Sequence, residues 1–182
     1  ELLEKDSKKN NIVISGLALV DRNTVINDLS IFFTDTLKVE ISPSSIALIY
    51  FRAQSQGSGG MAIISFSRNE DKWKVLRQSG LLRGTGVYLD QDYSKEIRTK
   101  RAKLFHLRTY IAKASEGVRT PIKIYNDLLA WKQFKFTWDE EEGLTCNDES
   151  GIPEIERQLK MNISAINIAL RSPSKRTPAQ NK

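Results

Sequence analysis

The chain has 182 residues, of which 40% are hydrophobic and 27% charged, and its formal net charge is +6. This balance is typical of a globular protein with one domain or two small ones, and the positive charge favours a polyanionic partner. With Cys146 as its one cysteine and His106 as its one histidine, the sequence excludes an internal disulfide framework, a multi-cysteine zinc site and a two-histidine metal motif. We therefore expect no metal and no cofactor.

The start of the chain is mostly polar. Residues 1–10 are expected to be the trailing end of a helix or coiled coil, with a frayed terminus as the alternative. The chain begins at Glu1 and shows no secretory leader, so we expect a fragment of a longer protein from the cytosol or the nucleus. No apolar run approaches the roughly 18–20 residues that a membrane span needs, and we expect no membrane partner.

Residues 11–90 are expected to form one domain. Three consecutive β-branched residues, ended by Gly16, predict a buried strand over Asn11–Leu17. The elements expected after it are a helix capped by Asn23 or Thr24 and running to Leu37, a strand over Ile46–Arg52, a flexible loop over Gln54–Gly60, a strand over Met61–Phe66, a helix over Asn69–Ser79 and a short strand over Val87–Leu89. This β-α-β-β-α-β order predicts a ferredoxin-like α+β domain, in which both helices cover one face of an antiparallel sheet and leave the other face open.

The pattern changes after residue 90. Residues 91–145 are expected to form a small second domain of one helix, Ser94–Glu116, followed by short strands. The strand segments are Ile122–Tyr125 and, as one or two further strands, Leu128–Trp131 and Phe134–Trp138. Residues 146–170 are expected to hold an acidic turn and a final helix over Ile152–Ala169. Residues 171–182 are expected to be a disordered basic tail.

The charge of the chain is polarised. Between Arg83 and Lys123 the bases outnumber the acids by ten to four, whereas Asp139–Glu156 holds eight acids and no base. Helical spacing places Arg98, Arg101 and Arg108 on one side of the predicted helix, with Lys100 and Lys103 on its flank. Such a stripe suits a row of phosphates, and a solvated helix face without a ligand is the alternative. The acidic run is expected to be a solvated turn.

Two segments match the short signatures of RNA recognition motifs except at the aromatic positions. Ile12–Leu17 fits the first-strand signature but has Val13 in place of its ring. In the third-strand signature, Gly60, Ala62, Ile64 and Phe66 match, while Met61 and Ile63 replace the two stacking rings. The frame of the motif is therefore predicted without most of its base stacking. Whether Tyr50, Phe51 and Tyr88 compensate or only pack against the sheet stays open.

Four segments in this order and spacing carry a family resemblance, and they are Lys9–Leu17, Leu82–Asp90, Asp92–Arg101 and Phe136–Leu144. Over about residues 8–145 the chain resembles the RNA-binding region of the first open reading frame protein of LINE-type non-LTR retrotransposons, in the form common in insect elements. The baculovirus few-polyhedra protein and its insect relatives have a similar layout and are the competing resemblance.

The retrotransposon resemblance implies a noncanonical RNA recognition motif without its usual rings, followed by a small C-terminal domain. It implies that single-stranded nucleic acid binds in a basic cleft between the two domains. The basic stripe beside a ringless sheet predicts that this binding has little sequence preference. It further implies a nucleic-acid chaperone that coats its own transcript, trimerises through a preceding coiled coil and resides in cytoplasmic ribonucleoprotein particles, with the nucleus as a second compartment. By the resemblance, Arg83 matches the basic position before the fourth strand, and Arg98, Lys100 and Arg101 match the basic patch that opens the second domain.

The sequence predicts a larger set of nucleic-acid-binding residues. It adds the neighbouring lysines and arginines and one tyrosine to these positions. The full set is Arg83, Tyr88, Lys95, Arg98, Lys100, Arg101, Lys103, Arg108 and Lys123. RNA is the expected partner, with DNA open. A protein-interaction module on the same ringless fold is the alternative. An enzyme is not expected, because the acidic cluster Asp139–Glu142 has no phosphate-binding loop, nucleophile elbow or histidine base beside it.

Overall fold

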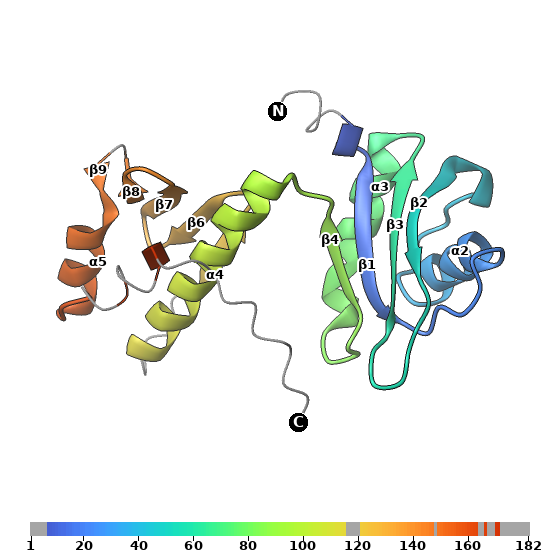
Figure 1. Cartoon of the computed structure of the whole chain (residues 1–182), viewed down its shortest axis with the longest axis horizontal. Helices are drawn as coiled ribbons and strands as arrows, with labels where there is room; N and C mark the ends of the chain where they lie inside the picture. Colours follow the sequence, from blue (N-terminus) through green and yellow to red (C-terminus); the bar gives the residue numbers. More distant parts are fainter. Residues whose placement is uncertain (1–6, 116–120, 148, 164–165, 167–169, 172–182) are drawn as a thin grey trace. The chain divides into compact units, whose positions relative to one another are not determined.

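The computed structural model describes residues 7–115, 121–147, 149–163, 166 and 170–171 of the chain (Figure 1). The chain divides into two compact units, residues 1–94 and 95–182. Each unit combines helices with its own antiparallel sheet and its own core. The predicted α+β class is confirmed, with two antiparallel sheets and four α-helices among the described residues. None of the described helices combines the length and the apolar character needed to cross a bilayer.

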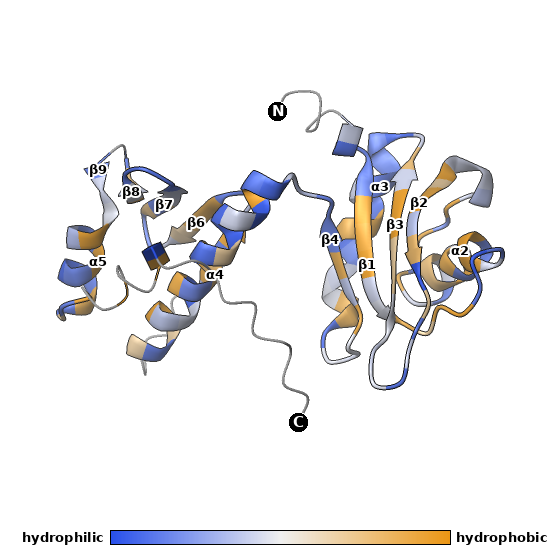
Figure 2. Cartoon of the chain, viewed as in Figure 1, coloured by the Kyte–Doolittle hydropathy of each residue, from blue (hydrophilic) through white to orange (hydrophobic). Residues whose placement is uncertain are grey.

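From Asn11 onward, the first unit contains four strands, two α-helices and two short 3-10 helices. In chain order they are β1 (Asn11–Leu17), α2 (Val25–Asp35), η1 (Pro43–Ser45), β2 (Ile46–Arg52), β3 (Gly60–Phe66), α3 (Asn69–Arg77), η2 (Gln78–Leu82) and β4 (Tyr88–Gln91). The strands lie in the order β2-β3-β1-β4, and every neighbouring pair is antiparallel. Figure 2 shows hydrophobic residues concentrated along β1 and β3, the two central strands.

The core of the first unit lies between the sheet and its two helices. Alternate residues of β1 and β3, among them Ile12, Ile14 and Ile64, are fully buried against the inner sides of α2 and α3. Because side chains alternate along a strand, the residues between them face the other side of the sheet. No helix among the described residues of this unit covers that face (Figure 1).

Three glycine backbones cross closely at one end of this sheet. Gly16 has a φ of +89° at the irregularity in the β1–β3 register between Ser15 and Leu17, and a Cβ built on it would lie 2.1 Å from the carbonyl oxygen of Gly86. A Cβ on Gly59 would lie 2.5 Å from the Cα of Gly16. Only glycine fits this crossing, which joins the ends of β1, the β2–β3 loop and the approach to β4.

A buried lysine of α3 forms hydrogen bonds with the residues that precede β1 and end β4. Lys72 of α3 is 3% exposed, and its Nζ donates to the carbonyl of Lys9 at 2.6 Å and to Oε1 of Gln91 at 3.1 Å. Beside it, Nδ2 of Asn11 donates to Oδ2 of Asp92 at 3.2 Å. These bonds tie the start of β1 to α3 and to the end of β4.

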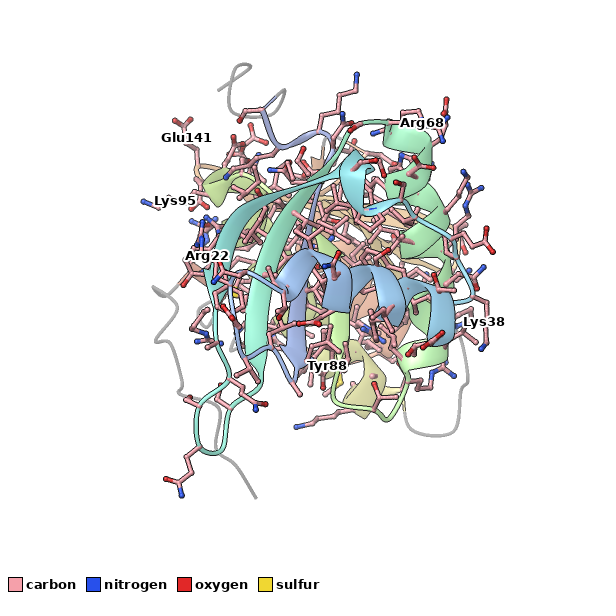
Figure 3. All side chains as sticks on the ribbon, turned by 90° about the vertical axis from the view of Figure 1, so that its right-hand side faces the viewer. Arg22, Lys38, Arg68, Tyr88, Lys95 and Glu141 are labelled. Atoms are coloured by element: carbon pink, nitrogen blue, oxygen red, sulfur yellow. The ribbon has the colours of Figure 1, made fainter. Side chains whose placement is uncertain are left out.

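At the start of α3, Asp71 forms ion pairs with two cations. Its carboxylate is almost fully buried, and it accepts hydrogen bonds from Arg68 at 3.1 and 3.2 Å and from Lys74 at 2.8 Å. These bonds lower the pKa of Asp71, with the Lys74 ammonium as the largest cause. Figure 3 shows Arg68 at this end of the helix.

Over residues 95–115, 121–147 and 149–163, the second unit packs two helices with a five-stranded sheet. Its elements are α4 (Lys95–Ala114), β5 (Ile122–Tyr125), β6 (Leu128–Trp131), β7 (Phe134–Asp139), β8 (Gly143–Cys146), β9 (Glu149–Ser150) and α5 (Gly151–Leu159). The strands follow one another across the sheet in chain order. Leu104, Leu107, Trp131, Phe136 and Ile155 are among the buried residues of its core.

The end of the second unit differs from the sequence prediction. The acidic run Asp139–Glu156, predicted as a solvated turn, contains the strands β8 and β9. The predicted final helix over Ile152–Ala169 is wrong in extent, because α5 ends at Leu159 and Lys160 adopts a left-handed conformation with φ 54°. Residues 164–165, 167–169 and 172–182, and the predicted coiled-coil end at 1–6, lie outside the described residues.

Candidate nucleic-acid interface

The basic helix α4 opens the second unit and carries most of the predicted site. Its 20 residues span about 30 Å. Leu104, Leu107 and Ile111 recur at helical spacing and are fully buried against the sheet. This stripe fixes which side of α4 faces the core, and the opposite side faces solvent.

Four cations on α4 are exposed. They lie along the whole helix, from its first residue to its last turn, and are Lys95, Arg98, Arg108 and Lys113. Figure 3 labels Lys95 at the start of the helix. Within the described part of the chain, none of the four forms an ion pair with a carboxylate. Their charges are therefore available to a polyanion.

Arg101 and Lys103, both predicted to contact nucleic acid, are buried in the second unit. Arg101 is 9% exposed, and its Nη1 donates to the carbonyl of Asn126 in the β5–β6 turn at 2.8 Å. Lys103 is 6% exposed, and its Nζ donates to the carbonyl of Leu170 and lies 5.6 Å from the ring centroid of Trp138. The prediction that both side chains belong to an exposed basic stripe is corrected, because they are buried and bind backbone carbonyls of their own unit.

Lys100 is half-buried and already has a partner. Its Nζ lies 2.8 Å from Oε1 of Glu96, one turn before it on the helix. This hydrogen-bonded carboxylate raises the pKa of Lys100. Lys100 therefore stays charged, but a phosphate would have to compete with Glu96 for it.

The solvent side of α4 also holds an aromatic ring that sequence reasoning did not assign to the site. Phe105 is 41% exposed. Together with Arg108, Thr109, Ala112 and Lys113 it lines an open hollow of about 460 Å³. A helical wheel contains the signal, since Phe105 lies well away from the stripe formed by Leu104, Leu107 and Ile111. His106, the next residue of the helix, is exposed as well.

The remaining predicted residues lie on both units and are exposed. Arg83 directly follows η2, and Tyr88, with 70% of its side chain exposed, is the first residue of β4 (Figure 3). Lys123 lies on β5 of the second unit. All three are therefore accessible on the unit to which they belong.

The open face of the first sheet is mainly aliphatic at its centre. Val13 lies opposite Ile63 on one side and Asp90 on the other, and the next row places Ser15 between Met61 and Tyr88. Tyr50, opposite Ile63 on β2, is 44% exposed. Phe51 instead packs against the core on the other face. Two tyrosines at the sheet's outer strands are thus the rings that this face offers.

The acidic segment that follows β7 forms the hairpin turn to β8. Oδ1 of Asp139 accepts hydrogen bonds from the backbone N–H groups of Glu142 and Glu141, at 3.0 and 2.8 Å, and these bonds lower its pKa. Glu140, Glu141 and Glu142 are exposed, as predicted for a solvated turn. Among the described residues, no three side chains of the metal-ligating types are grouped as a metal site.

Comparison with known proteins adds no assignment to this geometry. No protein-family model matches the chain, and no curated protein matches it.

Proposed function

We propose that the protein binds single-stranded nucleic acid, with RNA as the natural partner, through phosphate contacts and with little sequence preference. The observation that carries the proposal is the set of four exposed cations on α4 that have no carboxylate partner among the described residues. The first and last of them are separated by about 27 Å along the helix axis, a length over which a flexible strand presents several phosphates.

The first unit supports the same proposal through its topology. Its element order and its β2-β3-β1-β4 sheet are those expected of a ferredoxin-like RNA recognition motif. We propose this fold for residues 11–90, followed by a small C-terminal nucleic-acid-binding domain. Since Val13, Met61 and Ile63 replace the usual rings, this sheet offers little stacking, and phosphate contacts become the dominant source of affinity.

The wider biological role follows from the sequence resemblance. We propose the RNA-binding region of a retrotransposon protein that coats its transcript in ribonucleoprotein particles, acts as a nucleic-acid chaperone and trimerises through a preceding coiled coil. Low specificity suits this role, because a coating protein must bind every segment of a long transcript.

Salt dependence tests the proposal directly. The affinity for a mixed-sequence single strand of about 30 nucleotides should fall steeply with salt, with a log–log slope of about −0.7 for each phosphate neutralised. Replacing the four exposed α4 cations by glutamine should reduce the magnitude of this slope by up to about 3. The measurement is a fluorescence-anisotropy titration at several salt concentrations.

The matched control removes the same charge elsewhere. It replaces two arginines and two lysines that are exposed outside α4, namely Arg22, Arg77, Lys38 and Lys135. This control should keep most of the wild-type slope. Equal loss in both quadruple variants would reduce the effect to net charge, and a wild-type affinity that barely changes with salt would refute the proposal.

A protein-interaction module is the second candidate, and the aliphatic centre of the open sheet face favours it. Val13, Met61 and Ile63 are half-buried neighbours on adjacent strands, and such a surface suits an apolar partner segment as well as a base. Capture of a protein partner after nuclease treatment, combined with no oligonucleotide binding at low salt, would favour this function over the first.

A further inference from the structure

We propose that the hollow beside Phe105 on α4 is a stacking site for one unpaired nucleobase, flanked by two phosphate-binding cations. This inference rests on the proposed function and adds to it the part of the ligand that the site takes. It places a base-stacking ring on the second unit, whereas the open sheet of the first unit has lost its central rings.

The ring is held on one side. The guanidinium carbon of Arg101 lies 5.5 Å from the ring centroid of Phe105, and Arg101 is itself fixed by its 2.8 Å hydrogen bond to the carbonyl of Asn126. Arg101 precedes Phe105 by one helical turn. The residues that line the hollow with Phe105 all follow it by one to two turns. Arg101 therefore supports the ring from one side and leaves the side toward the hollow accessible.

Two of the residues that line the hollow suit a flat aromatic ligand. Ala112 has a small side chain, and the Thr109 hydroxyl donates to the carbonyl of Phe105 at 3.0 Å, so its hydrogen-bonding proton is already used within the helix. Neither residue brings a charge that would reject a base. Thr109 and Ala112 therefore offer no base-specific hydrogen-bond pattern, which agrees with low sequence preference.

The two cations at the rim select the occupant. Arg108 and Lys113 are exposed and unpaired among the described residues, and both line the hollow. An apolar peptide side chain would gain nothing from them, whereas each base of a nucleic acid carries phosphates on either side. Because bases in a duplex are already stacked, the site should take bases of single strands or loops.

Substitution of the ring separates stacking from charge. Phe105→Leu keeps an apolar side chain and removes the ring. We expect it to lower the affinity for a mixed-sequence single strand by about five- to a hundredfold and to leave the salt slope unchanged. Affinity for an abasic strand of equal length should stay at the wild-type value, because that strand keeps the phosphates and lacks the bases. Phe105→Trp should retain wild-type affinity for both strands.

Two further variants serve as controls for the effect of Phe105→Leu. Trp73→Leu removes a ring that is also 41% exposed on a helix, but in the first unit, and should leave both affinities unchanged. Ala112→Leu fills the hollow and keeps the ring of Phe105. It should lower the affinity for the base-containing strand only, and it tests the site even if Phe105→Leu perturbs folding. The unfolding midpoint of each variant is measured alongside.

The outcomes distinguish this site from the function on which it rests. Wild-type binding with a normal salt slope, unaffected by Phe105→Leu and by Ala112→Leu, would overturn the stacking site alone. Equal losses for the base-containing and abasic strands would overturn it as well, since stacking cannot act on an abasic strand. A wild-type protein that binds neither strand at low salt would overturn both proposals.

Discussion

Arg101 and Arg108 lie two turns apart on α4, and helical spacing puts them on nearly the same side. In the structure, Arg101 is buried on a turn carbonyl and Arg108 is exposed. The difference lies in what packs beside each residue, since the β5–β6 turn presents the carbonyl of Asn126 to the first of them only. A spacing argument finds the side of a helix and contains no information about the neighbouring turn.

We therefore expect Arg101 to contribute mainly to the stability of the fold, and less to the affinity for nucleic acid. Arg101→Ala leaves the Asn126 carbonyl without this donor and should lower the free energy of unfolding by roughly 1–3 kcal/mol. Arg98→Ala, at an exposed position, should change it by less than about 0.5 kcal/mol. Urea denaturation measures both. An Arg101→Ala protein of wild-type stability would show that the buried contact contributes nothing.

Lys72 should give stability a distinct pH dependence. Burial lowers its pKa below the ordinary value of 10.5, while the nearby Asp92 carboxylate acts in the opposite direction. Between the folded-state pKa and the unfolded value, the unfolded chain binds the extra proton, so this group makes the protein more stable as the pH rises through that interval. Lys72→Met should remove this increment from a denaturation series between neutral pH and about pH 10.

The matched control for Lys72 is Lys135→Met at an exposed position of β7. It should follow the wild-type pH dependence. If Lys72→Met also followed it, the buried ammonium would have no measurable effect on the linkage between folding and proton binding.

At the scale of elements, the strands with strong local patterns were predictable and those without were not. The β-branched run at Asn11–Leu17 and the alternating segment Ile122–Tyr125 have the predicted bounds. β8 was missed, since Gly143–Cys146 is short and follows an acidic turn. Its residues become a buried strand through pairing with β7 and through the packing of α5 on it. These partners are neighbouring elements, and the segment Gly143–Cys146 itself carries no strand pattern that predicts them.

The helix α5 is an integral part of the second core. Ile155 is fully buried, and a Cβ on Gly151 at the start of the helix would lie 3.1 Å from side-chain atoms of Leu144 and Phe136. Ile155→Ala should lower the free energy of unfolding by roughly 2–5 kcal/mol, because it leaves a cavity. Ile152→Ala, at a half-buried position of the same helix, should have a smaller effect.

The fluorescence of Trp131 and Trp138 reports this unfolding, because both side chains are buried in the second core and Trp73 is the tryptophan of the first unit. Equal destabilisation by the two isoleucine variants would contradict the placement of Ile155 at the centre of the α5–sheet contact.

Part of the candidate site was predictable from the sequence. The surplus of lysines and arginines between Arg83 and Lys123 identified α4 as the basic helix, because net charge is a property of composition. Which of these side chains face solvent depends on the carbonyls and rings that pack beside them. A helical wheel places Phe105 away from the buried apolar stripe of α4, and in the structure its ring is 41% exposed.

At the scale of the whole molecule, the chain joins two units that each have a complete core. Exposed cations of the predicted site occur on both, with Arg83 on the first and Lys123 and the α4 cations on the second. The acidic turn after Asp139 belongs to the same unit as α4. Positive charge is therefore concentrated on particular elements and is not an average property of the surface.

The crossing of the glycine backbones affects how a mutational scan of this protein should be interpreted. A side chain at Gly16 or Gly59 collides with backbone atoms, so most variants there will be depleted from any selection for activity. Their depletion would match that of a residue that touches the ligand. A companion selection for cellular abundance separates the two, because scaffold positions fail both selections and contact positions such as Arg108 should fail only the first.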